Sequence, residues 1–160
     1  MTRIRGSLKI ISPVEITGVD EAPVQVSETS AKTQYWSCTG CNFVARQPDV
    51  NDIIYTPSFG KVAASVDDII FFAPVFLPHT ATILAVEVFG NAGASAENWD
   101  LWRRDLATNL TVQLATANIN TEDTSIINPI IDNNLYSYHI DTDSLDTGDE
   151  IWGARITYTI

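Results

Sequence analysis

The feature that most constrains the fold is an alternation of apolar and polar residues with a period of two. In residues 98–106, Trp99 and Leu101 lie on one predicted face of a strand, and Trp102 lies on the opposite, more polar face. The same period recurs in four further segments: 80–89, 109–117, 134–141 and 150–160. This period is typical of antiparallel strands that bury one face. Turn-forming residues separate the segments and helical periodicity is absent, so the sequence predicts an all-β fold.

Short strands at regular spacing predict an antiparallel β-sandwich, jelly-roll-like in its connections. We assign the sandwich to residues 36–160. Residues 1–35 differ, because prolines and glycines keep any strand there short, and they are predicted to form an extended N-terminal arm.

The alternation also predicts which side chains share a face. Leu84, Val86 and Val88 are expected together, opposite Ala85 and Glu87. In the last segment the shared face is expected to hold five residues: Trp152, Ala154, Ile156, Tyr158 and Ile160.

The most apolar stretch is "IIFFAPVFLPH", residues 69–79. Residues 69–73 contain no polar position, which predicts a strand covered on both faces. Pro74 cannot donate to a strand ladder and is expected at a strand end, an edge or a bulge. The run falls well short of the ~20 apolar residues that a membrane span needs, so no membrane partner is expected.

Charge limits the partners further. Twenty acidic residues against nine basic ones leave a net charge of -11. A nucleic acid or an anionic membrane surface repels such a protein, so neither is an expected partner. The N-terminal residues lack the apolar core of a signal peptide, which predicts synthesis in a cytoplasm.

Motifs for metal or redox chemistry are weak. Cys38 and Cys41 form a CxxC pair, but only His79 and His139 are available to complete a zinc site. The pair is open to three interpretations, which are buried thiols in a local turn, a strained disulfide, and metal or redox chemistry. We expect no metal and no cofactor.

The acidic segment "DTDSLDTGDE" places Asp141, Asp143, Asp146 and Asp149 at close spacing, as calcium prefers. However, Leu145 and Asp146 stand where a calcium loop has an acidic residue and a glycine. A polar turn is the favoured interpretation.

No hydrolase or metalloprotease motif is present, and paired acids lie in predicted loops, so we expect no catalytic residues and no enzyme. The aromatic residues are better candidates for binding. Trp102 is predicted to face away from Trp99, with Arg103 and Arg104 beside it in the chain, and Tyr136 and Tyr138 share the face opposite Leu135. They predict a glycan-stacking surface, a subunit interface, or a face that the N-terminal arm covers.

Residues 7–17 contain Ile10, Ile11 and Val14 and are a candidate for strand addition to a neighbouring subunit. Such an exchange satisfies main-chain donors at an open sheet edge.

From Cys38 onward the chain resembles a loose group of small bacterial and phage-associated β-sandwich proteins. The resemblance rests on "APVFLPHTATI", "LWRRD" and "TGDEIWGARITY", which follow the group's "PVxLPHGAxI", "LxRRD" and "GDxLxGVxIxY" patterns. It implies the sandwich fold and no particular activity. Thr80 stands where the group has glycine, which puts the turn after His79 in doubt.

These observations predict a non-enzymatic structural subunit that self-associates into a homo-oligomer. A virion component or an extracellular filament or appendage subunit fits this prediction, by analogy with other sandwiches alone. The alternative is a carbohydrate- or receptor-binding module that uses Trp102, Tyr136 and Tyr138.

Overall fold

A computed structural model describes residues 31–46 and 53–160 of the chain. The described compact unit begins at Ala31. Ile10, Ile11 and Val14, and with them the predicted strand-adding segment, lie outside the described residues. The assignment of residues 1–35 to an arm therefore stays a prediction, although the first strand begins within that range, at Thr33.

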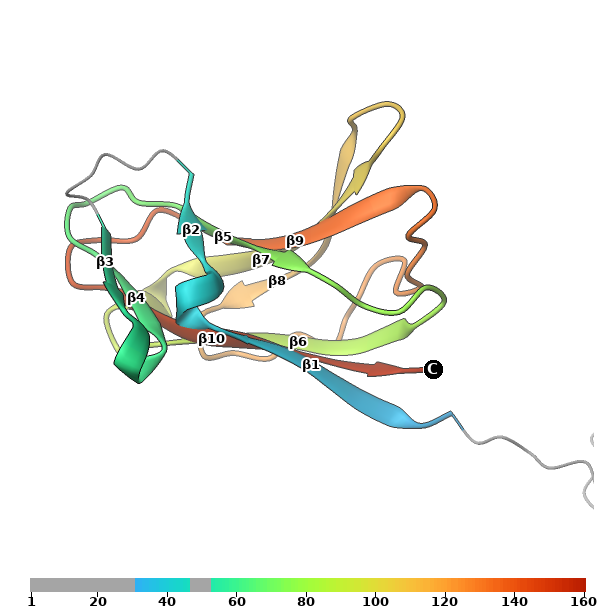
Figure 1. The fold of residues 1–160 in the computed structure, drawn as a ribbon, viewed down its shortest axis with the longest axis horizontal. Helices are drawn as coiled ribbons and strands as arrows, with labels where there is room; N and C mark the ends of the chain where they lie inside the picture. Colours follow the sequence, from blue (N-terminus) through green and yellow to red (C-terminus); the bar gives the residue numbers. More distant parts are fainter. Residues whose placement is uncertain (1–30, 47–52) are drawn as a thin grey trace, which may run out of the picture. The chain divides into compact units, whose positions relative to one another are not determined.

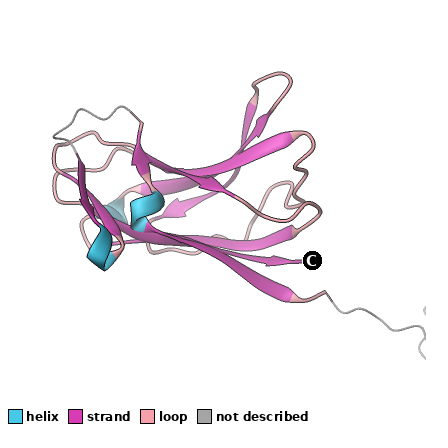
Figure 2. Cartoon of the chain, in the orientation of Figure 1, coloured by secondary structure: helices cyan, strands magenta, loops and turns pink. Residues whose placement is uncertain are grey.

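The described residues form ten strands and three short 3-10 turns (Figures 1 and 2). None of these turns is long or apolar enough to cross a membrane. The strands are β1 (Thr33–Thr39), β2 (Val44–Ala45), β3 (Ile53–Thr56), β4 (Lys61–Ala64), β5 (Phe71–Val75), β6 (Thr82–Gly90), β7 (Asn98–Asp105), β8 (Thr111–Asn118), β9 (Tyr136–Thr142) and β10 (Glu150–Thr159). The turns are η1 (Gly40–Asn42), η2 (Pro57–Phe59) and η3 (Ala94–Ala96).

The strands form two antiparallel sheets that pack as a sandwich, which confirms the predicted fold class (Figure 1). In the first sheet β10 is central. It pairs with β6 along one side, while β4 and then β1 share its other side. Strand β3 extends this sheet beyond β4.

The second sheet has the order β2-β5-β9-β7-β8. The segment after β8 returns to the first sheet, where Asp123 and Ile130 bridge to β6. Apart from the hairpin β7–β8, successive long strands exchange sheets in the order of a jelly roll, with the segment after β8 counted as a strand of the first sheet.

The inner faces of the two sheets form one apolar core. Trp99 and Leu101 of β7 are fully buried, as the alternation predicted, and they pack with residues of the first sheet such as Ile151 and Ile156. Each such side chain contributes about 1.5–3 kcal/mol through burial, so the core supplies the main stabilisation of the fold.

The apolar run 69–79 differs from its prediction. Buried and exposed residues alternate through β5, and Phe72 is 37% exposed while Phe76, just beyond it, is 75% exposed. The expectation of a strand covered on both faces is wrong, because no second layer of the described residues covers the outer face of β5. In the described part of the chain, strand β2 pairs only with Phe71 and Phe72 of β5, so the edge of β5 at Pro74 has no strand partner on that side, as the missing N–H of proline requires.

Two β-bulges also change the predicted faces. On β6, Leu84 is skipped between the paired residues Ile83 and Ala85, and it is exposed, whereas Val86 and Val88 face the core as predicted. On β10, Trp152 is skipped in the pairing with β6 and turns outward. Both residues were predicted to face the core. The prediction is wrong for each of them because a bulge breaks the strict period of two.

Gly153 makes the second bulge possible. Its φ of 155° suits glycine, and an added Cβ would lie 2.3 Å from the carbonyl oxygen of Cys38 on β1. The bulge therefore depends on the absence of a side chain at this position.

Candidate functional site

The predicted binding residues are divided between the two faces of the second sheet. Trp102 pairs with His139, and Arg104 pairs with Ser137, on the outer face. Arg103 pairs with Tyr138 on the inner face. Residues opposite each other on antiparallel strands share a face, so the tryptophan and the tyrosines do not form one surface.

The inner group is part of the packing between the sheets. The Arg103 guanidinium lies 4.5 Å from the centroid of the Tyr136 ring. Tyr138 is buried, its hydroxyl accepts a hydrogen bond of 2.8 Å from the Asp132 backbone N–H, and burial raises its pKa. Ile140, two residues further and fully buried, was the sequence signal that this face of β9 points inward.

The outer face gathers polar groups around one indole ring. Trp102 lies between Gln113 of β8 and His139 of β9, and Asp100 lies beside Asp141 in the neighbouring row. We call the outward side chains of this region the Trp102 face: Asp100, Trp102, Arg104, Gln113, His139 and Asp141.

Hydrogen bonds hold these side chains in position. Trp102 Nε1 donates to Asp141 Oδ1 at 2.7 Å, and Gln113 Nε2 donates to Asp100 Oδ1 at 2.5 Å. Asp141 is a diagonal neighbour of Trp102, so the indole must lean along the sheet surface to reach it. In this position the indole is partly buried on the outer face of the sheet.

Burial controls the charges on this face. It raises the pKa of Asp141 to about 6, with further increases from Asp100 and Asp143, while the hydrogen bond from Trp102 and the charge of Arg46 act in the opposite direction. Burial, and then the Arg104 guanidinium, lower the pKa of His139. At pH 7 the Asp141 carboxylate is therefore mostly ionised and accepts hydrogen bonds, while the lowered pKa of His139 favours a neutral imidazole, which both donates and accepts.

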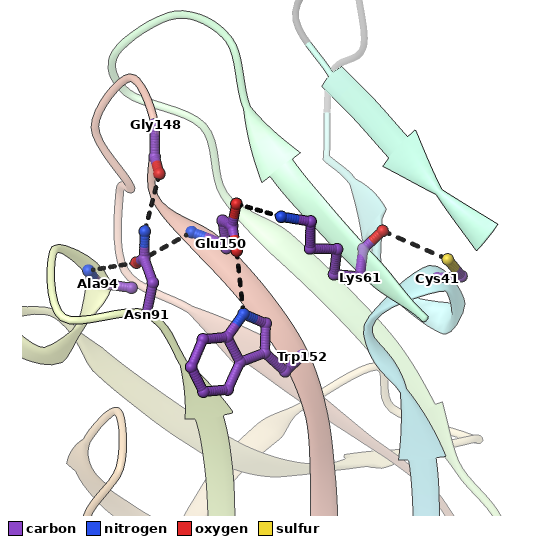
Figure 3. Close-up of polar contacts among 7 residues, drawn as sticks. All are labelled: Cys41, Lys61, Asn91, Ala94, Gly148, Glu150 and Trp152. Carbon is purple, nitrogen blue, oxygen red and sulfur yellow. Dashed lines mark hydrogen bonds and ion pairs between the residues drawn. The ribbon is translucent and has the colours of Figure 1, made fainter. Parts of the chain in front are cut away.

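A second outward-facing indole, more exposed than that of Trp102, was assigned to the wrong face by the alternation. Trp152 is 51% exposed on the outer face of the first sheet, and its Nε1 donates to Glu150 Oε2 at 3.0 Å (Figure 3). The isolated glycine at position 153 was the available sequence signal, since a glycine within a strand pattern often marks a bulge.

The other candidates have structural partners. Cys41 Sγ donates to the Lys61 carbonyl at 3.3 Å, while Cys38 is a free thiol that faces the inner side and whose pKa is raised by burial. Asp149 is buried and its Oδ2 accepts from the Asp146 backbone N–H, as expected of a polar turn. Across residues 31–46 and 53–160, no three His, Cys, Asp or Glu side chains are placed to hold a metal ion.

No family model and no curated protein matches the sequence. Among solved structures, the chain is distantly similar to the C-terminal CBM6 of LamC, a marine laminarinase from Zobellia galactanivorans. The identity is 12%, the TM-score is 0.49, and the match covers 78% of this chain and 99% of the other.

The xylan-binding module CBM15 matches with 16% identity and a TM-score of 0.42 over 79% of this chain and 97% of the module. A structure of infectious bursal disease virus, Gx strain, matches with 12% identity and a TM-score of 0.33 over 92% of this chain and 37% of the viral chain. Likenesses of this strength concern the arrangement of strands, and the function has to be inferred from the geometry of the sites.

Proposed function

We propose that the protein is a non-enzymatic carbohydrate-binding module that holds a saccharide on the Trp102 face. The observation that carries this proposal is the indole of Trp102, which a hydrogen bond to Asp141 fixes within a ring of polar side chains. Saccharide recognition needs this combination, because a sugar ring presents an apolar C–H face and a rim of hydroxyl groups.

The polar side chains of the face match the rim of a sugar. Carboxylate oxygens of Asp100 and Asp141 accept hydrogen bonds from hydroxyl groups, while Gln113 and Arg104 donate to them. Gln113 and Trp102 are already oriented by hydrogen bonds, so binding requires little further loss of side-chain freedom.

The charge of the protein selects the class of saccharide. The net charge of -11 and the two carboxylates beside Trp102 repel an anionic polymer. A neutral oligosaccharide or polysaccharide is the expected ligand.

Isothermal titration of the full chain against a panel of neutral oligosaccharides, with an acidic polysaccharide as comparison, tests this function. We expect Trp102→Ala to weaken binding at the Trp102 face about tenfold or more, because hot-spot tryptophans contribute 2 kcal/mol or more. Leu110→Ala, which truncates an exposed apolar residue of the β7–β8 turn, is the matched control and should bind normally. The absence of binding to any neutral saccharide, or full binding by Trp102→Ala, would contradict the proposal.

A second candidate function is a self-associating structural subunit, as in a virion or an extracellular filament. Among the described residues β1 pairs only with β10, which leaves its other edge open. A shallow groove at that edge is lined by Trp36 and Cys38 of β1, by Pro74 of β5 and by the exposed Phe76 just beyond β5. This edge and groove suit an added strand with apolar side chains, and we propose residues 7–17 of a neighbouring copy as that strand.

Light scattering coupled to size exclusion tests this candidate. The full chain should form a defined oligomer, and deletion of residues 7–17 should convert it to a folded monomer. An equal mass for the two chains would rule out strand addition by this segment.

A further inference from the structure

The first sheet carries a second aromatic position that the Trp102 face does not include. Trp152 is the most exposed of the four tryptophans, since Trp99 is fully buried and Trp36 and Trp102 are partly buried. The bulge at Gly153 turns its indole away from the core. Because it is turned toward solvent, this indole is accessible to a ligand.

Three side chains on this face form a connected set. Val62 and Ala64 of β4 face the core, so Lys61 points outward, beside the start of β10. There Lys61 Nζ forms an ion pair of 2.5 Å with Glu150 Oε1, while Glu150 Oε2 accepts the hydrogen bond from Trp152 (Figure 3).

The backbone under this set is also fixed. Asn91 Oδ1 accepts hydrogen bonds from the backbone N–H groups of Ala94 and Glu150, at 3.0 and 3.2 Å, and Asn91 Nδ2 donates to the Gly148 carbonyl at 2.9 Å (Figure 3). The indole edge is therefore anchored to a carboxylate that is itself held from two sides. Such an arrangement lowers the entropic cost of binding a ligand against the ring.

The remaining binding capacity identifies the chemistry of the ligand. Lys61 Nζ carries two further N–H donors, and the carboxylate of Glu150 has free lone pairs. The hydrogen bonds from Lys61 and Trp152 lower the pKa of Glu150, so it stays an ionised acceptor at neutral pH. Because the two charges compensate each other, the set favours a neutral ligand with hydroxyl groups at the rim of an apolar face.

We propose that Trp152, Glu150 and Lys61 form a second saccharide site; this inference rests on the proposed function and extends it. The two sheets of a sandwich pack through their inner faces, so their outer faces point in opposite directions. The Trp152 site and the Trp102 face cannot bind the same short stretch of a glycan. The module is therefore bivalent and crosslinks two polysaccharide chains.

The test compares the full chain with Trp102→Ala, Trp152→Ala and the double variant. Titration with a short neutral oligosaccharide measures the number of sites, and turbidity with the corresponding polysaccharide measures crosslinking. We expect two sites per chain and turbidity for the parent, one site and no turbidity for each single variant, and no binding by the double variant. Lys61→Met, which keeps the indole, should weaken the second site by tenfold or more.

The outcomes separate the inference from the function on which it rests. If Trp152→Ala keeps both sites and full turbidity while Trp102→Ala loses one site, the second site is overturned and the proposed function stands. If the parent binds no saccharide, both are overturned. If the parent is a dimer by light scattering and Trp152→Ala is a monomer with unchanged saccharide binding, Trp152 is a subunit contact and the inference is overturned. Thermal unfolding of each variant verifies that it is folded.

Discussion

Trp102 Nε1 donates a hydrogen bond of 2.7 Å to Oδ1 of Asp141, although the direct cross-strand partner of Trp102 is His139. The contact joins the main aromatic residue of the candidate site to the acid whose pKa burial raises from its ordinary value of 3.8 to about 6. The hydrogen bond that holds the indole therefore depends on the charge of this carboxylate, and a change of pH should alter both.

The folded-state pKa of Asp141 exceeds its ordinary value, so between about pH 4 and pH 6 the folded chain binds more protons than the unfolded chain. The stability contribution of this group therefore falls as pH rises through that window. Asp141→Asn keeps an oxygen acceptor for Trp102 and carries no charge. With allowance for solvent screening at a half-buried site, we expect it to raise the free energy of unfolding by about 1 kcal/mol at pH 8 and to have little effect below pH 4.

Urea unfolding of the parent and of Asp141→Asn at several pH values measures this difference. Asp143→Asn, at an exposed position near the end of β9, is the control and should change the free energy of unfolding less. A gain that is the same at every pH would show that the charge of Asp141 is not its cause.

Thr80 has a φ of 70°, a left-handed conformation that is rare for a β-branched residue. The turn thus has a backbone conformation that suits glycine better than threonine. Thr80→Gly should stabilise the chain by about 1 kcal/mol, because the relief of strain exceeds the entropy cost of glycine. Thr80→Ala keeps a Cβ and should bring no such gain, and thermal unfolding of the two variants distinguishes them.

Gly153 is expected to tolerate substitution poorly. Gly153→Ala combines a φ of 155° with a Cβ 2.3 Å from the Cys38 carbonyl oxygen, and we expect a loss of about 3 kcal/mol in the free energy of unfolding. Gly148→Ala is the matched control. Its φ is 92° but nothing lies within 4 Å of the added Cβ, so strain alone should cost about 1 kcal/mol. Equal losses in chemical unfolding would argue against the close approach of β1 to this bulge.

The hydroxyl of Tyr138 is expected to have a structural role. Tyr138→Phe leaves the Asp132 N–H without its partner and should lower the free energy of unfolding by about 1 kcal/mol. Tyr136→Phe keeps the ring under Arg103 and removes a hydroxyl that forms no hydrogen bond within the described residues, so its effect should be near zero. A reversed order in denaturant titrations would contradict the assignment of Tyr138 to the core.

The fold class could be predicted because its evidence is local. In β7 the alternation correctly separated Trp99 and Leu101, which are buried, from Trp102. Each strand carries this signal in its own residues, since a half-buried strand needs one apolar face wherever it lies in the sheet.

The candidate sites were less predictable. The spacing showed that Tyr136 and Tyr138 share a face. Ile140, two residues further, indicates that this face points inward, but tyrosine suits either side of a sheet, and the pairing with β7 was needed to place them. Trp152 was assigned to the core because a period of two assumes an unbroken ladder.

The amino-acid sequence by itself determined an acidic, all-β chain of short strands and the face that Trp102 occupies. Tertiary structure alone decided which side chains lie next to Trp102 and Trp152. The contact between Trp102 and Asp141 depends on the register of β7 against β9, and the exposure of Trp152 depends on a bulge where β1 passes close to Gly153. Registers and bulges arise from pairing between segments far apart in the chain, and no local pattern of residues encodes them.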